Sequence, residues 1–138
     1  MKAVFIDSAV LLYALGGPHA LQEPCRALLT RASDGGLSMH MSVKGGQELL
    51  VHRLRRVGRD EALLDFEDID ALVHWHSFDA EVLRASGQIV RRGEARERDA
   101  VQAATAIAAG FTEFVSPDPD FDGIAGLRRV DPRELAAT

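Results

Sequence analysis

Near its amino terminus the chain reads Ala3-Val4-Phe5-Ile6-Asp7-Ser8, a short β-rich run that ends in two polar residues. Such a run is typical of a buried parallel strand that delivers polar side chains at its carboxyl end. A second run of this kind, residues 111–115, ends at Ser116-Pro117-Asp118. Because the carboxyl ends of parallel strands share one edge of a sheet, the two acidic endings predict a site at that edge.

Helical and strand-like segments alternate between and around these two runs. Apolar spacing, with Gly, Pro and capping residues as boundaries, predicts helices over 10–15, 19–32, 43–57, 59–74, 80–91 and 100–109, and further strands over 37–41 and 127–130. No internal repeat, linker or low-complexity tract interrupts the pattern. We therefore predict that residues 1–138 form a single α/β domain whose mainly parallel sheet is covered by helices on both faces.

The composition is that of an ordinary globular protein. A chain of 138 residues can build one hydrophobic core, and no apolar run approaches the roughly 20 residues that span a bilayer. The apolar run before Asp7 is too short for a signal peptide, so we expect a cytoplasmic protein without membrane contact. The formal net charge of −5 means that any contact with nucleic-acid phosphates must be local. The single Cys25 is expected in the core.

Four acidic residues stand at positions that a parallel sheet would bring together. They are the two strand-end acids, the acid that opens the alanine-rich helix and one acid within an apolar helix: Asp7, Asp118, Asp99 and Glu48. Each also has an ordinary interpretation, which is a turn former for Asp7 and Asp118, an N-cap for Asp99 and a solvent-facing position for Glu48. Their joint placement favours a common site.

Four blocks of the sequence carry a resemblance to a known family. They are Val4-Phe5-Ile6-Asp7-Ser8, the isolated Glu48, Arg98-Asp99-Ala100 before an alanine-rich helix closed by Ala109-Gly110, and residues 114–121. Together they resemble the PIN-domain family, and within it the small VapC-type toxins of bacteria and archaea. The resemblance extends over essentially the whole chain and implies a PIN-like, three-layer α/β/α fold.

The resemblance also implies an activity and its residues. PIN-domain toxins of this type are Mg²⁺- or Mn²⁺-dependent endoribonucleases, usually homodimers that a small antitoxin protein keeps inactive, so RNA and an antitoxin are the expected partners. Carried over by position, the catalytic and metal-holding acids are Asp7, Glu48, Asp99 and Asp118. Ser8 and Ser116, the latter in place of a common Thr, would hydrogen-bond these acids. Asp120 and Asp122 lie near enough that the fourth acid stays open.

Clustered carboxylates explain why such a site needs a cation. Two carboxylates about 5 Å apart repel each other by roughly 3 kcal/mol at an effective dielectric constant of about 20. Hard oxygen ligands suit Mg²⁺ or Mn²⁺, which lowers the pKa of a bound water and neutralises charge on a scissile phosphate. We therefore expect RNA phosphodiester hydrolysis by a metal-activated water.

Two other functions stay open from the sequence. A metal-dependent phosphatase or phosphotransferase also places Asp at a strand end, but it usually needs a second Asp soon after, and Ser8-Ala9-Val10 follows here. A catalytically inactive PIN-like binding module is the other alternative, which the presence of all four acids disfavours.

Basic and aromatic residues form weaker signals. Two arginine clusters, residues 53–59 and 91–98, are interpreted either as solvated helix faces or as contacts to substrate phosphates. The segment His74-Trp75-His76 fits a strand edge better than a metal site.

The predicted helix over 59–74 has an apolar face too wide for one small domain to cover, and it includes Leu63, Leu64, Phe66 and Leu72. Part of that face is expected to be an interface, and the antitoxin is expected to pack on an apolar groove and to direct a basic side chain toward the acids.

Overall fold

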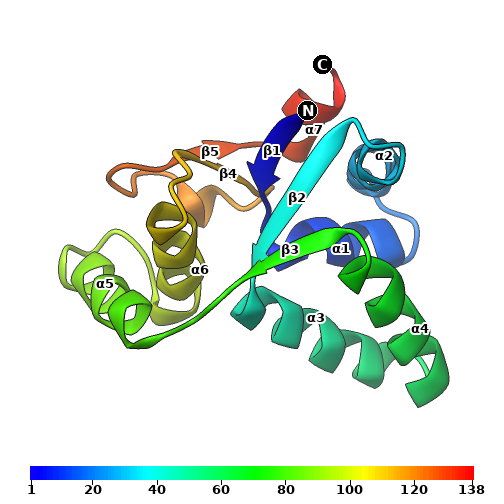
Figure 1. Cartoon of the computed structure of the whole chain (residues 1–138), viewed down its shortest axis with the longest axis horizontal. Coiled ribbons are helices and arrows are strands. Elements are labelled where there is room, and N and C mark those ends of the chain that lie inside the picture. Colours follow the sequence, from blue (N-terminus) through cyan, green and yellow to red (C-terminus); the bar gives the residue numbers. More distant parts are fainter.

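The computed structural model describes all residues, 1–138, and contains a parallel sheet (Figure 1). Its strands are β1 (Lys2–Phe5), β2 (Leu37–Ser42), β3 (Val73–His76), β4 (Glu113–Val115) and β5 (Arg128–Val130). Strands β1, β2 and β3 pair in parallel in that order, and β4 pairs in parallel with β5. A parallel bridge between Ile6 and Val115 joins the two groups, so the strands follow the order β3-β2-β1-β4-β5.

Helices cover both faces of this sheet. They are α1 (Ser8–Leu15), α2 (Gln22–Ser33), α3 (Val43–Arg56), α4 (Arg59–Asp70), α5 (Ala80–Arg91), α6 (Glu97–Ala108), α7 (Pro132–Ala136) and a 3₁₀ turn, η1 (Pro119–Phe121). Figure 1 shows α5 and α6 on one side of the sheet and α1 to α4 on the other. The predicted three-layer α/β/α architecture is therefore confirmed.

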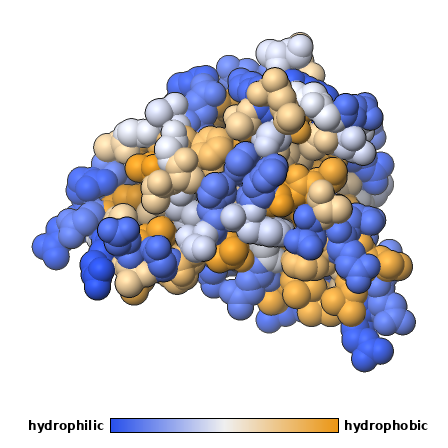
Figure 2. Space-filling model, in the orientation of Figure 1, coloured by the Kyte–Doolittle hydropathy of each residue, from blue (hydrophilic) through white to orange (hydrophobic).

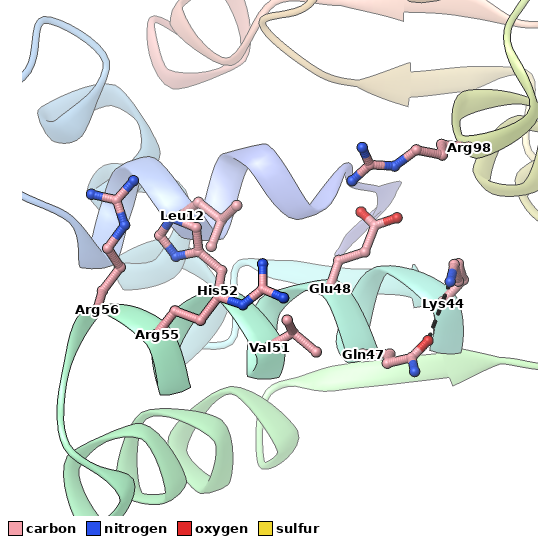
Figure 3. A pocket seen from close by; sticks show the side chains of 9 residues that line it. All are labelled: Leu12, Lys44, Gln47, Glu48, Val51, His52, Arg55, Arg56 and Arg98. Carbon is pink, nitrogen blue, oxygen red and sulfur yellow. Dashed lines mark hydrogen bonds between the residues drawn. The ribbon is translucent and has the colours of Figure 1, made fainter.

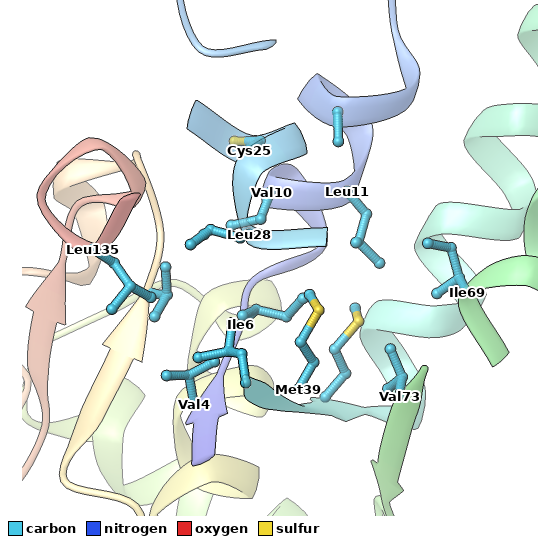
Figure 4. Packing of buried hydrophobic residues seen from close by; sticks show 14 of the residues in the cluster. Val4, Ile6, Val10, Leu11, Cys25, Leu28, Met39, Ile69, Val73 and Leu135 are labelled. Carbon is cyan, nitrogen blue, oxygen red and sulfur yellow. The ribbon is translucent and has the colours of Figure 1, made fainter. Parts of the chain in front are cut away.

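The buried side chains form two clusters, one for each face of the sheet. The larger cluster joins β1 and β2 to α1 and α2, with Ile6, Val10, Leu28 and Met39 at its centre (Figure 4). Cys25 is fully buried in this cluster, as predicted. The smaller cluster packs Phe5, Phe114 and Phe121 against α5 and the alanines of α6, whose small side chains let that helix lie close to the sheet.

Local sequence explains most of the boundaries. The Ser42 and Asp79 side chains accept hydrogen bonds from the N–H groups of Lys44 and Val82, and so cap α3 and α5. Pro24 lies in the first turn of α2, where its missing N–H costs no hydrogen bond. None of the helices is both long enough and apolar enough to cross a bilayer.

Several predicted boundaries were wrong, including the starts of α1 and α2, which lie at Ser8 and Gln22 instead of residues 10 and 19. Helix α4 ends at Asp70 instead of residue 74, because Val73 to His76 pair with β2 as an edge strand. Helix α6 begins at Glu97, two residues before Asp99, and β4 begins at Glu113 instead of Phe111. The short helix α7 was not predicted; Asp131 caps it by accepting a hydrogen bond from the Arg133 N–H.

Candidate functional site

The carboxyl edge of the sheet collects the acids from four separate segments. Asp7 follows β1, Asp118 follows β4, Asp99 lies in the first turn of α6, and Glu48 lies in the middle of α3. The Ile6–Val115 bridge holds the first two segments side by side, since the Asp7 N–H donates to the Val115 carbonyl at 2.9 Å. The predicted convergence of these residues on one edge is what the structure shows.

Asp7 is the deepest of the acids, with only 5% of its surface exposed. One of its oxygens accepts a hydrogen bond from the Ser116 hydroxyl at 2.8 Å, and the other faces the Ser8 hydroxyl at 3.3 Å. Burial raises the pKa of the Asp7 carboxyl, and the hydrogen bond from Ser116 opposes that rise. Asp7 is therefore fixed in orientation by two hydroxyl groups, Ser8 and Ser116.

Glu48 lies beside Asp7 and has an unused oxygen. Its Oε2 accepts from the Ser8 hydroxyl at 3.1 Å and from the Gln102 amide at 3.4 Å. The Ser8 hydroxyl has a single proton, so it serves Asp7 or Glu48 but not both at once. The Glu48 Oε1 is buried and has no hydrogen-bond partner in the protein. An orphaned carboxylate oxygen at this depth is suited to a ligand that brings positive charge or a donor.

Asp99, Asp118 and Asp120 form the outer part of the cluster. Each offers one oxygen, and these three atoms lie within 4.8 Å of one another. The Asp118 N–H donates to the Ser116 hydroxyl at 3.0 Å, and the Asp120 N–H donates to Asp118 Oδ1 at 2.9 Å. Ser116 thus connects the buried Asp7 to the loop that carries the outer acids.

The electrostatic consequence is clearest at Asp99. Its pKa rises to about 6, first because of burial and then because of the negative charges of Asp7, Asp118, Asp120 and Glu48. None of the five acids forms an ion pair with a Lys, Arg or His of the chain. The cluster is an uncompensated concentration of negative charge.

This donor set fits a hard divalent cation. The converging ligand atoms are carboxylate oxygens of Asp99, Asp118 and Asp120, and the nearby Glu48 adds a buried oxygen, Oε1, that has no hydrogen-bond partner. Oxygen-only sites with several carboxylates suit Mg²⁺ or Mn²⁺ better than Zn²⁺, which prefers thiolate and imidazole. The three histidines His40, His74 and His76 stack on one another, with His40 Nδ1 2.8 Å from His76 Nε2, but they do not form a group of converging ligand atoms.

The structure also answers a question that the sequence left open. Asp120 joins the cluster, whereas Asp122 points to Arg129, whose Nε donates to it at 2.8 Å. Asp99 is not the N-cap of α6, because the cap position is Arg96. The ordinary interpretation of Asp118 is partly correct, since its side chain caps the turn η1 while facing the cluster.

Gln102 is the residue that the sequence analysis missed. It is 3% exposed and reaches Glu48 from α6, one turn after Asp99. The spacing of three residues between Asp99 and Gln102 puts both on one helix face, and that spacing was the signal available in the sequence.

Comparisons with known proteins agree with this arrangement. The family model described as PIN domain matches residues 4–127. Ribonuclease VapC7 of Mycobacterium tuberculosis is 32% identical over 132 residues, covering 94% of this chain and 91% of that protein.

Two solved structures illustrate the similarity of fold. VapBC2 from Rickettsia felis, bound to a DNA fragment from its promoter, has a TM-score of 0.72 at 15% identity, with coverage of 95% of this chain and 98% of that one. Mycobacterium tuberculosis VapC20, a sarcin-ricin loop cleaving toxin, has a TM-score of 0.69 at 17% identity, with coverage of 91% and 98%. The chain belongs to the PIN domain family and, within it, to the VapC group.

Proposed function

We propose that this protein is a Mg²⁺- or Mn²⁺-dependent endoribonuclease that acts as the toxin of a toxin-antitoxin pair. The observation that carries the proposal is the convergence of five carboxylates, Asp7, Glu48, Asp99, Asp118 and Asp120, with no cationic side chain paired to any of them. The names of two relatives support it, since VapC7 is a ribonuclease and VapC20 cleaves the sarcin-ricin loop.

The acids divide into two groups by position. Asp99, Asp118 and Asp120 would hold the ion through the three oxygens that approach one another, and Asp7 and Glu48 would orient it from the buried side. When bound, the ion supplies charge to the phosphate and lowers the pKa of a water that it binds. Positive charge at this position would also lower the raised pKa of Asp99 and extend its ionised range below pH 6.

The serines act through the acids they touch. Ser116 donates to Asp7 and accepts from the Asp118 backbone, so one hydroxyl sets the relative position of an inner and an outer acid. Ser8 lies within hydrogen-bond distance of the two inner acids, Asp7 and Glu48, and donates its single proton to one of them at a time. Such supporting hydrogen bonds orient ligands and tune their basicity.

An antitoxin is the proposed protein partner, as in the VapBC2 complex from Rickettsia felis. A mainly apolar groove of about 400 Å³ lies between α3 and α4, lined by Val43, Leu50, Phe66 and Trp75. Leu54 of α3 and Leu63 and Leu64 of α4 are also exposed. Figure 2 shows apolar residues gathered at the lower right, where Figure 1 places α3 and α4. We propose that an amphipathic antitoxin segment packs there, and that the chain is a homodimer.

Cleavage of RNA by the purified protein tests the proposal. We expect a mixture of total RNA and short synthetic RNAs to be cut in Mg²⁺ or Mn²⁺ and to stay intact in EDTA. An Asp99→Asn protein purified in parallel controls for contaminating nucleases. Sequencing the 5′ ends of the fragments identifies the substrate. Undiminished cleavage in EDTA, or in the Asp99→Asn protein, would exclude the proposed mechanism.

A further inference from the structure

A trough runs along α3 from the acidic cluster toward the carboxyl end of that helix. It has a volume of about 450 Å³, and its walls come from α1, α3 and the start of α6. Glu48 stands at one end, with Arg98 reaching toward it from α6, and Arg55 and Arg56 stand at the other (Figure 3). One end of the trough therefore reaches Glu48, one of the five proposed catalytic acids, and arginines line the trough at both ends.

A second hollow, of about 570 Å³, continues the first. The two share Leu12, His52 and Arg56 as lining residues. The second hollow is also lined by Tyr13 and His19, whose rings pack 4.6 Å apart at an angle of 36°. These two half-exposed or exposed rings form an aromatic shelf beyond the arginines.

The arginines of this region differ in their partners. Arg53 is buried and donates to Asp65 at 3.0 Å, Arg59 lies 3.5 Å from Asp60, and Arg92 lies 3.1 Å from Glu94. By contrast, no carboxylate pairs with any of the three arginines that line the trough, Arg55, Arg56 and Arg98. Ion pairs within the protein thus involve two arginines of the first cluster and one of the second, whereas the arginines that line the trough are in no ion pair.

We propose that this trough holds a single-stranded segment of RNA next to the scissile phosphate, with its phosphates on Arg55, Arg56 and Arg98 and one base stacked on Tyr13 and His19. This inference rests on the proposed function and adds the path of the substrate to it. Arginine recognises phosphate oxygens bidentately, and aromatic rings stack on bases that are not paired. A chain of net charge −5 attracts RNA only through such a local concentration of cations.

The dimensions agree with a short segment. Glu48 and Arg56 are eight residues apart on α3, about 12 Å along its axis. Stacked nucleotides advance about 3.4 Å each along a strand, so this distance corresponds to about three nucleotides. A duplex presents its bases paired and stacked, so the aromatic shelf selects for a loop or an unpaired end.

RNA binding measured without cleavage tests the inference independently of the enzymatic activity. Fluorescence anisotropy would be recorded in EDTA with a labelled 12-nucleotide oligouridine and with a labelled hairpin stem, after a gel has shown both RNAs to be intact. We expect Arg55→Ala/Arg56→Ala to weaken oligouridine binding about 10-fold and to reduce the slope of log affinity against log salt by about 1.4, because each phosphate contact on a single strand contributes about 0.7.

A stacking contact has a different signature from a phosphate contact. We expect Tyr13→Leu to weaken oligouridine binding about 5-fold or more without changing the salt slope, and Tyr13→Phe to bind as the wild type. Arg59→Ala and Arg84→Ala are the matched controls, because both arginines are exposed and lie outside the trough. Both should bind within about twofold of wild type, and the stem should bind more weakly than oligouridine.

Three results would overturn the inference. They are unchanged affinity and salt slope in Arg55→Ala/Arg56→Ala, an equal loss in the control variants, and a loss of antitoxin binding without a loss of RNA binding, which would assign the trough to the partner protein. A protein that binds RNA in this way but cuts none would leave the trough in place and contradict only the proposed enzymatic function.

Discussion

Two neighbouring groups of acids differ in their partners: the clustered acids are in no ion pair, whereas Asp122 and Asp131 pair with arginines. At the carboxyl edge of β1 and β4, the carboxylates have no cationic partner and the pKa of Asp99 is raised to about 6. Beyond β4, Arg129 donates to Asp122 at 2.8 Å and lies 3.8 Å from Asp131, which Arg133 also contacts at 2.8 Å. The hydrogen bond from Arg133 lowers the pKa of Asp131.

The difference supports a role for the clustered acids in binding a cation. The chain places arginines against acids where charge compensation serves the fold, and the paired group shows that this is possible in the same segment of sequence. Leaving the other acids unpaired destabilises the folded protein, since like charges raise the free energy of a compact site. Compensation at that site is therefore expected from a cation in solution.

We expect the largest effect on RNA cleavage from substitution of a clustered acid, and almost none from substitution of a paired acid. We expect Asp99→Asn to reduce RNA cleavage by at least about 100-fold, because losing a ligand should cost no less than losing a residue that supports one. Asp122→Asn changes charge equally but outside the cluster, and it should retain cleavage within about twofold. Rates would be measured on one labelled RNA under single-turnover conditions. Equal losses in the two variants would remove the distinction between the groups.

Ser116 offers a smaller effect on the same site. Ser116→Ala removes the hydroxyl that donates to Asp7 and accepts from the Asp118 N–H, and we expect cleavage to fall about 10-fold. Ser116→Thr keeps the hydroxyl and should restore most of the rate. A higher Mg²⁺ concentration for half-maximal activity in Ser116→Ala, at an unchanged melting temperature, would show that the serine positions the acids and does not merely support the fold.

The acids at the carboxyl edge of the sheet could be predicted from the sequence, whereas the contribution of the loop after β4 could not. Asp7 and Asp118 could be placed together because parallel strands share their carboxyl ends, and Asp99 because its helix starts at that edge. The choice of Asp120 over Asp122 could not be predicted, because it depends on Arg129, which pairing of β4 with β5 brings near.

The end of α4 was missed for a similar reason. A helical pattern continued to residue 74, but pairing of Val73 to His76 with β2 overrides it, and such pairing is a long-range contact that periodicity does not contain.

Metal should stabilise the protein through the unpaired acids alone. At a Mg²⁺ concentration about 100 times its dissociation constant, binding to the folded state raises the free energy of unfolding by about 2.7 kcal/mol. For a domain of this size, that increase raises the melting temperature by on the order of 10 °C. We expect that shift in wild type and Asp122→Asn, and a much smaller one in Asp99→Asn. Thermal melting in EDTA and in rising Mg²⁺ measures it, and a full shift in Asp99→Asn would show that Asp99 is not near the ion.

The smallest effect concerns the pH dependence of stability without metal. The pKa of Asp99 is about 6 in the folded protein and 3.8 ordinarily, so between these values the folded state binds more protons than the unfolded chain. Stability from this group is therefore present at low pH and is lost as pH rises through 6. After discounting for solvent screening, the loss is on the order of 1 kcal/mol, or about 4 °C.

The difference in melting temperature between wild type and Asp99→Asn isolates the contribution of Asp99. In EDTA, the melting temperature of Asp99→Asn should equal or exceed that of wild type at pH 7.5, and the difference should shrink by about 2 °C at pH 5 and by about 4 °C below pH 4, because groups common to both proteins cancel. Asp131 should behave oppositely. Its lowered pKa makes it stabilising above its ordinary range, so the advantage of wild type over Asp131→Asn should disappear as pH falls below about 4. If Asp99→Asn instead melts below wild type at every pH, Asp99 stabilises the first turn of α6 by its charge, and the contrast between the two acid groups does not hold.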